Sequence, residues 1–241
     1  MVRAAARREA GVGRELASEV PHRHRVPLGL MMLAQGWITH PQLRAALEKQ
    51  RESGTGRIGD WLVKEGGVDA EQITRALSMQ WGCPVLQGEG FSPEGMALVM
   101  PKLFVEKFGM IPLRVAGSRI LYLGSADKLD ASVALALEQM TELKVESGIV
   151  KGADFEGLRE RLLACDTVKV KLEKVGSADA MAARITAVLE QHQPVGSRLV
   201  RIHETYWLRL WLEAGAVGRA GSVPARADDV RDYLFTEEAS A

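Results

Sequence analysis

The spacing of apolar residues along the chain predicts a helical part followed by a mixed part. In residues 27–80 apolar side chains recur at steps of three and four, the period of an amphipathic α-helix. Beyond residue 90, helical stretches alternate with short apolar runs bounded by turn residues, which is the pattern of strands. Helices are expected at 91–108, 130–140 and 154–163, and strands at 110–115, 119–123 and 143–150. This order predicts the α+β fold class: an all-helical N-terminal part, then a small α+β domain.

The helical part is an internal duplication with a period of thirty residues. Residues 27–50 align with residues 57–80 without a gap, with six identical positions and six more that are apolar in both copies. Each copy predicts a short helix, a glycine that ends it, and a second helix. A duplicated helical hairpin packing on itself explains the apolar positions. The sequence therefore predicts a tandem hairpin repeat.

Packing alone does not explain five residues of this repeat. Gly29 and Gly59 fall inside the short helices, where glycine destabilises by up to about 1 kcal/mol relative to alanine unless something approaches the backbone closely. Gln50 and Gln80 end an apolar face and supply a donor and an acceptor together. Arg57 presents a planar fork suited to phosphate, or to the O6 and N7 atoms of guanine. Two such half-sites suit a ligand made of two similar anionic halves.

The repeat resembles a known family. Residues 57–80 follow the pattern R-[LI]-G-x-x-[LV]-[LV]-x-x-G-x-[VI]-x-x-x-x-[LI]-x-x-x-L-x-x-Q, which is similar to the N-terminal domain of type II secretion and type IV pilus assembly ATPases, specifically its MshE-type variant that binds cyclic di-GMP. The first copy departs at its opening position, where Pro27 replaces arginine. The resemblance continues loosely to about residue 165, through a phrase like that of residues 108–113.

In that family each repeat unit clasps one guanine half of the dinucleotide. The resemblance therefore implies a set of ligand-binding residues distributed over both copies: Leu28, Gly29, Leu43, Leu47, Gln50, Arg57, Ile58, Gly59, Ile73, Leu77 and Gln80. The loss of one bidentate guanine contact at Pro27 weakens binding by about 1–3 kcal/mol, against a total of about −8 kcal/mol for a micromolar ligand. Cyclic di-GMP therefore remains the expected ligand.

Residues 166–241 predict a charged linking or edge segment, a helix at 178–192, an aromatic strand at 197–213 and a tail. On one side of that strand lie Trp207, Arg209 and Trp211, a stripe that would suit stacking on a base or a planar partner group. Such a stripe also packs on a neighbouring helix or a second subunit, and we favour this interpretation. The residues after 213 are rich in Gly, Ala, Asp and Glu and are expected to form a loop and a poorly ordered tail.

Composition narrows the function further. Thirty-one basic residues balance thirty-one acidic ones, so the net charge does not indicate nucleic acid or a membrane as partner. Cys83 and Cys165 lie far apart, which predicts neither a disulfide nor a zinc site and suits a reducing cytoplasm. No apolar run has the length of a membrane span. No G-x-x-x-x-G-K-[ST] sequence occurs and the five histidines lack metal-ligand spacing, so neither ATP hydrolysis nor metal chemistry is expected.

The chain is accordingly divided into a disordered basic arm (1–25), the tandem helical repeat (26–88), the small α+β domain (89–165) and a C-terminal extension (166–241). The arginines of the arm leave binding to an acidic surface open. The predicted function is a non-catalytic, cytoplasmic regulatory protein that binds cyclic di-GMP, needs no cofactor, and contacts secretion or pilus assembly proteins. A nucleotide-independent interaction module of such a system is the alternative, which Pro27 favours. Formation of a homo-oligomer is left open.

Overall fold

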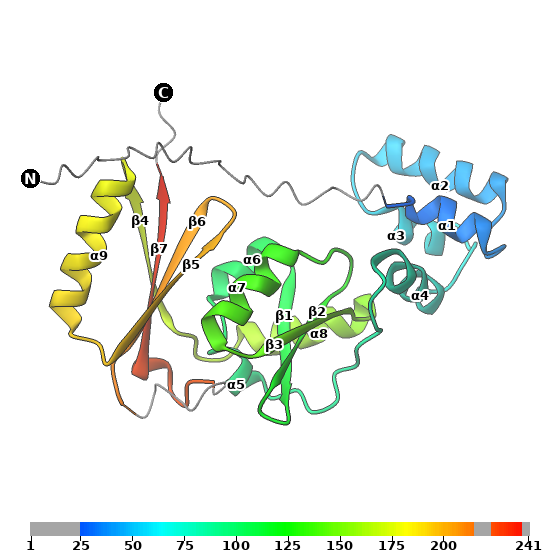
Figure 1. Ribbon diagram of the computed structural model, residues 1–241. Helices are drawn as coiled ribbons and strands as arrows, with labels where there is room; N and C mark the ends of the chain where they lie inside the picture. The colour runs from blue at the N-terminus through cyan, green and yellow to red at the C-terminus, as the bar shows by residue number, and fades with distance from the viewer. Residues whose placement is uncertain (1–24, 215–222, 238–241) are drawn as a thin grey trace, which may run out of the picture.

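The computed structural model describes residues 25–214 and 223–237, so the predicted arm lies outside the described residues except for Arg25. Three parts follow one another in space: a group of four helices, a middle domain built on one sheet, and a C-terminal sheet (Figure 1). The four helices are α1 (Leu28–Ala34), α2 (His40–Ser53), α3 (Ile58–Lys64) and α4 (Ala70–Trp81).

Local signals place the ends of these helices. Gly36 and Gly66 follow α1 and α3 with φ of 68° and 71°, a conformation that glycine adopts without strain. The N-caps of α2 and α4 are Thr39 and Asp69, and each backbone N–H donates to a glutamine three residues later, at 2.8 Å and 3.0 Å. The glutamine that the two copies share at this position therefore belongs to a capping box.

The two copies share one hydrophobic core. Helix α2 contacts α3, and α1 contacts α4, so each short helix packs on the long helix of the other copy. This arrangement differs from two hairpins that each pack on themselves. A helix of seven residues offers few core positions, and interlocking lets both short helices bury them together. The buried centre consists of Met32, Ile38, Ala46, Leu62 and Ala76.

The middle domain confirms the α+β class. Its elements are α5 (Pro93–Met96), α6 (Lys102–Phe108), β1 (Met110–Ala116), β2 (Ile120–Ser125), α7 (Ala131–Thr141), β3 (Lys144–Ile149) and α8 (Gly152–Leu163). Strands β1 and β2 are antiparallel, and β2 and β3 are parallel. The single helix expected at 91–108 is instead two short helices, because Pro101 lacks the N–H that a continuous helix needs and becomes the N-cap of α6.

The connection from α4 runs along this sheet. Leu86 N–H donates to the Ile149 carbonyl at 2.7 Å, and Ile149 N–H donates to the Pro84 carbonyl at 3.0 Å. The connection lies so close that a Cβ on Gly148 would come within 2.5 Å of Leu86 Cγ and 2.6 Å of the Pro84 carbonyl oxygen. Gly148 therefore permits the contact that anchors the four helices to the middle domain.

The C-terminal part forms a second sheet with strand order β4-β7-β6-β5. Its elements are β4 (Lys169–Val175), α9 (Ala178–His192), β5 (Gly196–Ile202), β6 (Thr205–Trp211), the 3-10 helix η1 (Ala227–Asp229) and β7 (Val230–Glu237). Helix α9 covers one face, and α6 and α7 lie between the two sheets (Figure 1). Strand β4 lies at an edge, in agreement with the sequence.

Two expectations for this part were wrong. The strand expected at 197–213 is a hairpin of β5 and β6, which turns at His203, a residue with φ of 51°. Part of the expected tail is β7, which lies between β4 and β6 and buries Tyr233, Leu234 and Phe235. The gain in buried apolar surface outweighs the polar composition of the neighbouring segment. The remaining tail, at 215–222 and 238–241, lies outside the described residues.

The aromatic stripe of β6 packs inside the protein. Trp207 is fully buried and meets Phe104 of α6 edge-on, with ring centroids 5.5 Å apart. Arg209 is buried beside it, makes two bonds of 2.8 Å to the Asp232 carboxylate, and donates to the carbonyls of Leu98 and Val99. The stripe therefore joins the second sheet to the middle domain. Within residues 25–214 and 223–237, no helix has the length and apolarity of a membrane span.

Candidate ligand-binding site

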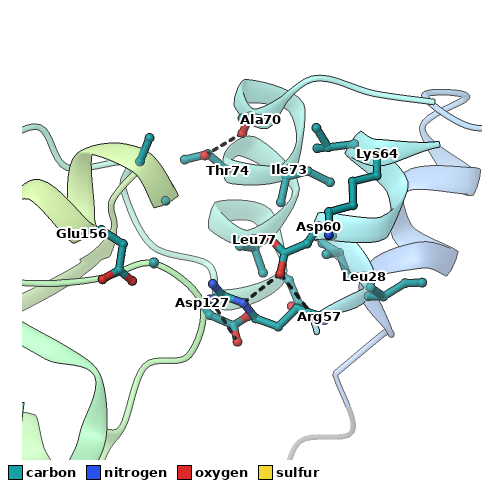
Figure 2. A pocket seen from close by; sticks show the side chains of 17 residues that line it. Leu28, Arg57, Asp60, Lys64, Ala70, Ile73, Thr74, Leu77, Asp127 and Glu156 are labelled. Atoms are coloured by element: carbon teal, nitrogen blue, oxygen red, sulfur yellow. Dashed lines mark hydrogen bonds and ion pairs between the residues drawn. The ribbon is translucent and has the colours of Figure 1, made fainter. Parts of the chain in front are cut away.

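A cavity of about 720 Å³ lies between the second helical copy and the middle domain. Helices α3 and α4 form one wall, and the loop after β2 together with the start of α8 forms the other (Figure 2). This volume is in the range of small-molecule sites. Seven of the eleven residues predicted for ligand binding line it: Leu28, Arg57, Ile58, Gly59, Ile73, Leu77 and Gln80.

The other four predicted residues lie outside this cavity. Gly29, Leu43, Leu47 and Gln50 belong to the first copy and occupy the positions equivalent to Gly59, Ile73, Leu77 and Gln80. The first copy contributes only Leu28 to the lining. The structure thus gathers the second half-site in one cavity and leaves the first half-site on the far side of Leu28.

The glycines of both copies permit the same close approach. A Cβ on Gly29 would lie 2.5 Å from Leu43 Cδ1, and a Cβ on Gly59 would lie 3.1 Å from Ile73 Cγ2. Leu43 and Ile73 are equivalent in the duplication. The sequence indicated that something approaches these glycines. In the protein it is the second helix of the same copy, so packing accounts for both glycines.

The two terminal glutamines also have a structural role that the sequence did not indicate. Gln50 Nε2 donates to the Gly56 carbonyl at 2.8 Å, and Gln80 Nε2 donates to the Val26 carbonyl at 2.7 Å. Gly56 and Val26 each precede the opening residue of a copy. The last residue of each copy therefore holds the start of the other copy, and the two bonds are equivalent. Gln80 does so at the edge of the cavity.

Arg57 supplies the guanidinium of the cavity. It is the N-cap of α3, and its side chain is 52% exposed. Its Nε lies 3.5 Å from Asp60 Oδ2, and its Nη1 lies 3.8 Å from Asp127 Oδ2 in the middle domain (Figure 2). Exposed ion pairs of this kind contribute about 0–1 kcal/mol. Arg57 can therefore exchange these partners for a ligand at little energetic cost.

The opposite wall was not predicted from the sequence. Asp127 follows β2, and Glu156 lies in the second turn of α8, where its Oε2 is 3.4 Å from Arg159 Nη1. Ala126, Gly152 and the neighbouring Ala153 complete this wall. These residues lie outside the repeat, and no motif marks them. Only the packing of the two domains brings them to Arg57.

The described residues offer little for catalysis or metal binding. Among them, no group of three or more His, Cys, Asp or Glu side chains is placed to hold a metal ion. The Thr74 hydroxyl in the cavity wall donates to the Ala70 carbonyl at 2.9 Å. Burial raises the pKa of the Cys83 thiol, which disfavours the reactive thiolate.

Similar proteins support the resemblance. No protein-family model matches the chain. The type IV pilus assembly ATPase PilB of Myxococcus xanthus (strain DK1622) is 27% identical over 169 residues, 64% of this chain and 30% of the relative. The PilB of Thermus thermophilus is 34% identical over 76 residues, 31% of this chain and 8% of the relative. Bacteriophage adsorption protein B of Escherichia coli K12 is 31% identical over 135 residues, 55% of this chain and 18% of the relative.

Among solved structures, that of MshE with cdg is 22% identical, covers 57% of this chain and 99% of its own, and has a TM-score of 0.46. The sequence matches to two proteins named PilB confirm the predicted resemblance to type IV pilus assembly ATPases. This chain spans less than a third of the length of each of these curated relatives.

Proposed function

We propose that this chain is a non-catalytic regulatory protein that binds cyclic di-GMP in the cavity between α3, α4 and α8. One observation supports this most: the cavity unites Arg57, Gly59 and Gln80 with the apolar residues that the repeat motif requires. The guanidinium fork matches a phosphate or the O6 and N7 atoms of guanine. Leu28, Ile58 and Leu77 offer an apolar surface against which a base can lie.

The second half of the ligand is proposed to lie against the first copy, at Gly29, Leu43, Leu47 and Gln50. Leu28 adjoins both half-sites, because it lines the cavity and a Cβ on Gly59 would lie 3.6 Å from its Cδ2. The equivalent bonds of Gln50 and Gln80 support a two-fold relation between the copies. A dinucleotide with two like halves suits such a pair of surfaces.

The resemblance to pilus assembly ATPases suggests where such a protein acts. We propose that it contacts secretion or type IV pilus assembly proteins, and that cyclic di-GMP regulates this contact. The cytoplasm is the proposed compartment, where Cys83 and Cys165, both free thiols, remain reduced.

One observation favours a second candidate, a nucleotide-independent interaction module. Pro27 occupies the N-cap of α1, where the second copy has Arg57, and so removes the guanidinium from one half-site. Calorimetric titration of the purified chain with cyclic di-GMP, with GTP as a control, separates the two. Regulation by the dinucleotide predicts saturable heat with a dissociation constant of about 1 µM, near −8 kcal/mol, and weaker binding of GTP. No heat at protein concentrations far above this value would leave the interaction module.

A further inference from the structure

The charges of the cavity pose a question that an anionic ligand alone does not answer. Two cations, Arg57 and Lys64, face three carboxylates, those of Asp60, Asp127 and Glu156. Phosphate groups are repelled by carboxylates, so an acidic wall opposes a site that binds phosphates alone. The acidic wall must therefore meet a part of the ligand that donates hydrogen bonds.

Guanine is such a group. Its N7 and O6 atoms accept hydrogen bonds, and beside O6 its Watson–Crick edge carries the N1–H and N2–H₂ donors. A guanidinium satisfies the first pair of atoms and a carboxylate satisfies the second. Adenine presents donors at N6 and an acceptor at N1, so the same two side chains would meet groups of the wrong kind.

Arg57 and Asp127 are arranged as such a pair. Arg57 Nη1 and Asp127 Oδ2 are 3.8 Å apart at the cavity, too long for a direct hydrogen bond, and both side chains are about half exposed. Neighbouring donor and acceptor groups on one edge of a base call for partners that lie side by side in this way. The loop holds Asp127 through its backbone N–H, which donates to Ser125 Oγ at 3.3 Å.

Glu156 is less suited to this role. Its carboxylate is engaged by Arg159 on the next turn of the same helix, at 3.4 Å. Asp127, by contrast, faces the guanidinium that the repeat motif supplies. Figure 2 shows Asp127 beside Arg57, with Glu156 on the other side of the cavity.

We infer that Arg57 and Asp127, contributed by two different domains, together read one guanine base, so that the middle domain sets the preference for guanine over adenine. This inference rests on the proposed binding of cyclic di-GMP. It makes the ligand a bridge between the four helices and the α+β domain. Asp127 becomes a specificity-determining residue that no repeat motif contains.

The test is calorimetric titration of the full chain with cyclic di-GMP and with cyclic di-AMP. The wild type is expected to prefer cyclic di-GMP. Asp127→Asn is expected to lower the affinity for cyclic di-GMP by about 5- to 150-fold, the effect of one bidentate base contact. Its affinity for cyclic di-AMP should stay the same or rise. Glu156→Gln is the matched control, because it neutralises another carboxylate of the cavity, and it should change neither affinity by more than about 2-fold.

Each outcome decides one point. If the wild type binds neither dinucleotide, the proposed function fails and this inference fails with it. If the wild type binds cyclic di-GMP but Asp127→Asn keeps the same preference, only the inference is overturned. It is also overturned if Asp127→Asn binds cyclic di-GMP more tightly, because Asp127 would then merely compete for Arg57. A loss in Glu156→Gln equal to that in Asp127→Asn would likewise contradict a specific role for Asp127.

Discussion

Gln80 and Gln50 make the same hydrogen bond in opposite directions between the two copies of the repeat. Gln80 holds the Val26 carbonyl at 2.7 Å, and Gln50 holds the Gly56 carbonyl at 2.8 Å. Each bond fixes the residue that precedes the opening position of a copy. The two opening positions, Pro27 and Arg57, are therefore presented in equivalent surroundings, and they differ in the side chain that they offer a ligand.

This equivalence predicts a gain of function. Pro27→Arg restores the guanidinium in the first copy, at an exposed N-cap whose ψ of 141° is close to the 150° of Arg57. Affinity for cyclic di-GMP should increase by about 5- to 150-fold, one bidentate contact. Pro27→Ala is the control, since it removes the ring without adding a charge. An equal effect of both substitutions in calorimetry would contradict a second half-site at the first copy.

The approach of the connection to β3 makes Gly148 intolerant of a side chain. Gly148→Ala should lower the free energy of unfolding by about 1–3 kcal/mol, because the Pro84 carbonyl is backbone and cannot simply rotate away. Gly157→Ala is the matched control in α8, where a Cβ would have nothing within 4 Å. Alanine should stabilise that exposed helix position by up to about 1 kcal/mol. Urea unfolding measures both, and equal stability of the two variants would contradict the contact.

The buried pair between β6 and β7 should be critical for folding. Asp232→Ala leaves the Arg209 guanidinium, which is 1% exposed, without its counter-charge and should destabilise the protein by about 3–5 kcal/mol. Asp228→Ala, which removes an exposed partner of Lys169, should have little effect on stability. Thermal unfolding followed by circular dichroism compares them. A small effect of Asp232→Ala would show that the second sheet does not depend on this pair.

The C-terminal sheet should lose stability in mild acid. Burial, and then the charges of Arg231, Arg184 and Lys171, lower the pKa of His192, which lies 2.8 Å from the Tyr233 hydroxyl. The unfolded chain, with a histidine pKa of about 6.5, takes up the proton first. The contribution of His192 to stability is therefore complete above that pH and is lost as the pH falls toward the lowered folded value.

Urea unfolding at pH values on either side of this window checks the expectation. His192→Gln should reduce the difference between the two stabilities. His40→Gln, at the exposed start of α2, is the control and should keep the wild-type difference. An unchanged pH dependence in His192→Gln would place its origin elsewhere.

The parts of the fold that depend on local chemistry were predicted from the sequence. Gly36 and Gly66 end their helices, and Thr39 and Asp69 cap the next ones, because these effects involve only residues a few positions apart. The α+β order of the middle domain followed from the change of apolar period.

Features that depend on distant contacts were not predicted. The interlocking of the two copies, the placement of β7 inside the second sheet and the role of Arg209 arise from tertiary packing. The candidate site divides in the same way. The duplication marked Arg57 and Gln80, whereas Asp127 reaches the cavity only because two domains pack together.

The most direct measurement of the central claim is the affinity of Arg57→Ala for cyclic di-GMP, compared with wild type by calorimetry. Arg75→Ala is the control, because Arg75 pairs with Glu71 on the exposed side of α4 at 3.1 Å, away from the cavity. The structure predicts a loss of about 5- to 150-fold, one bidentate contact, for Arg57→Ala with the fold intact, and an unchanged affinity for Arg75→Ala. Equal affinity of wild type and Arg57→Ala would contradict binding of the dinucleotide in this cavity.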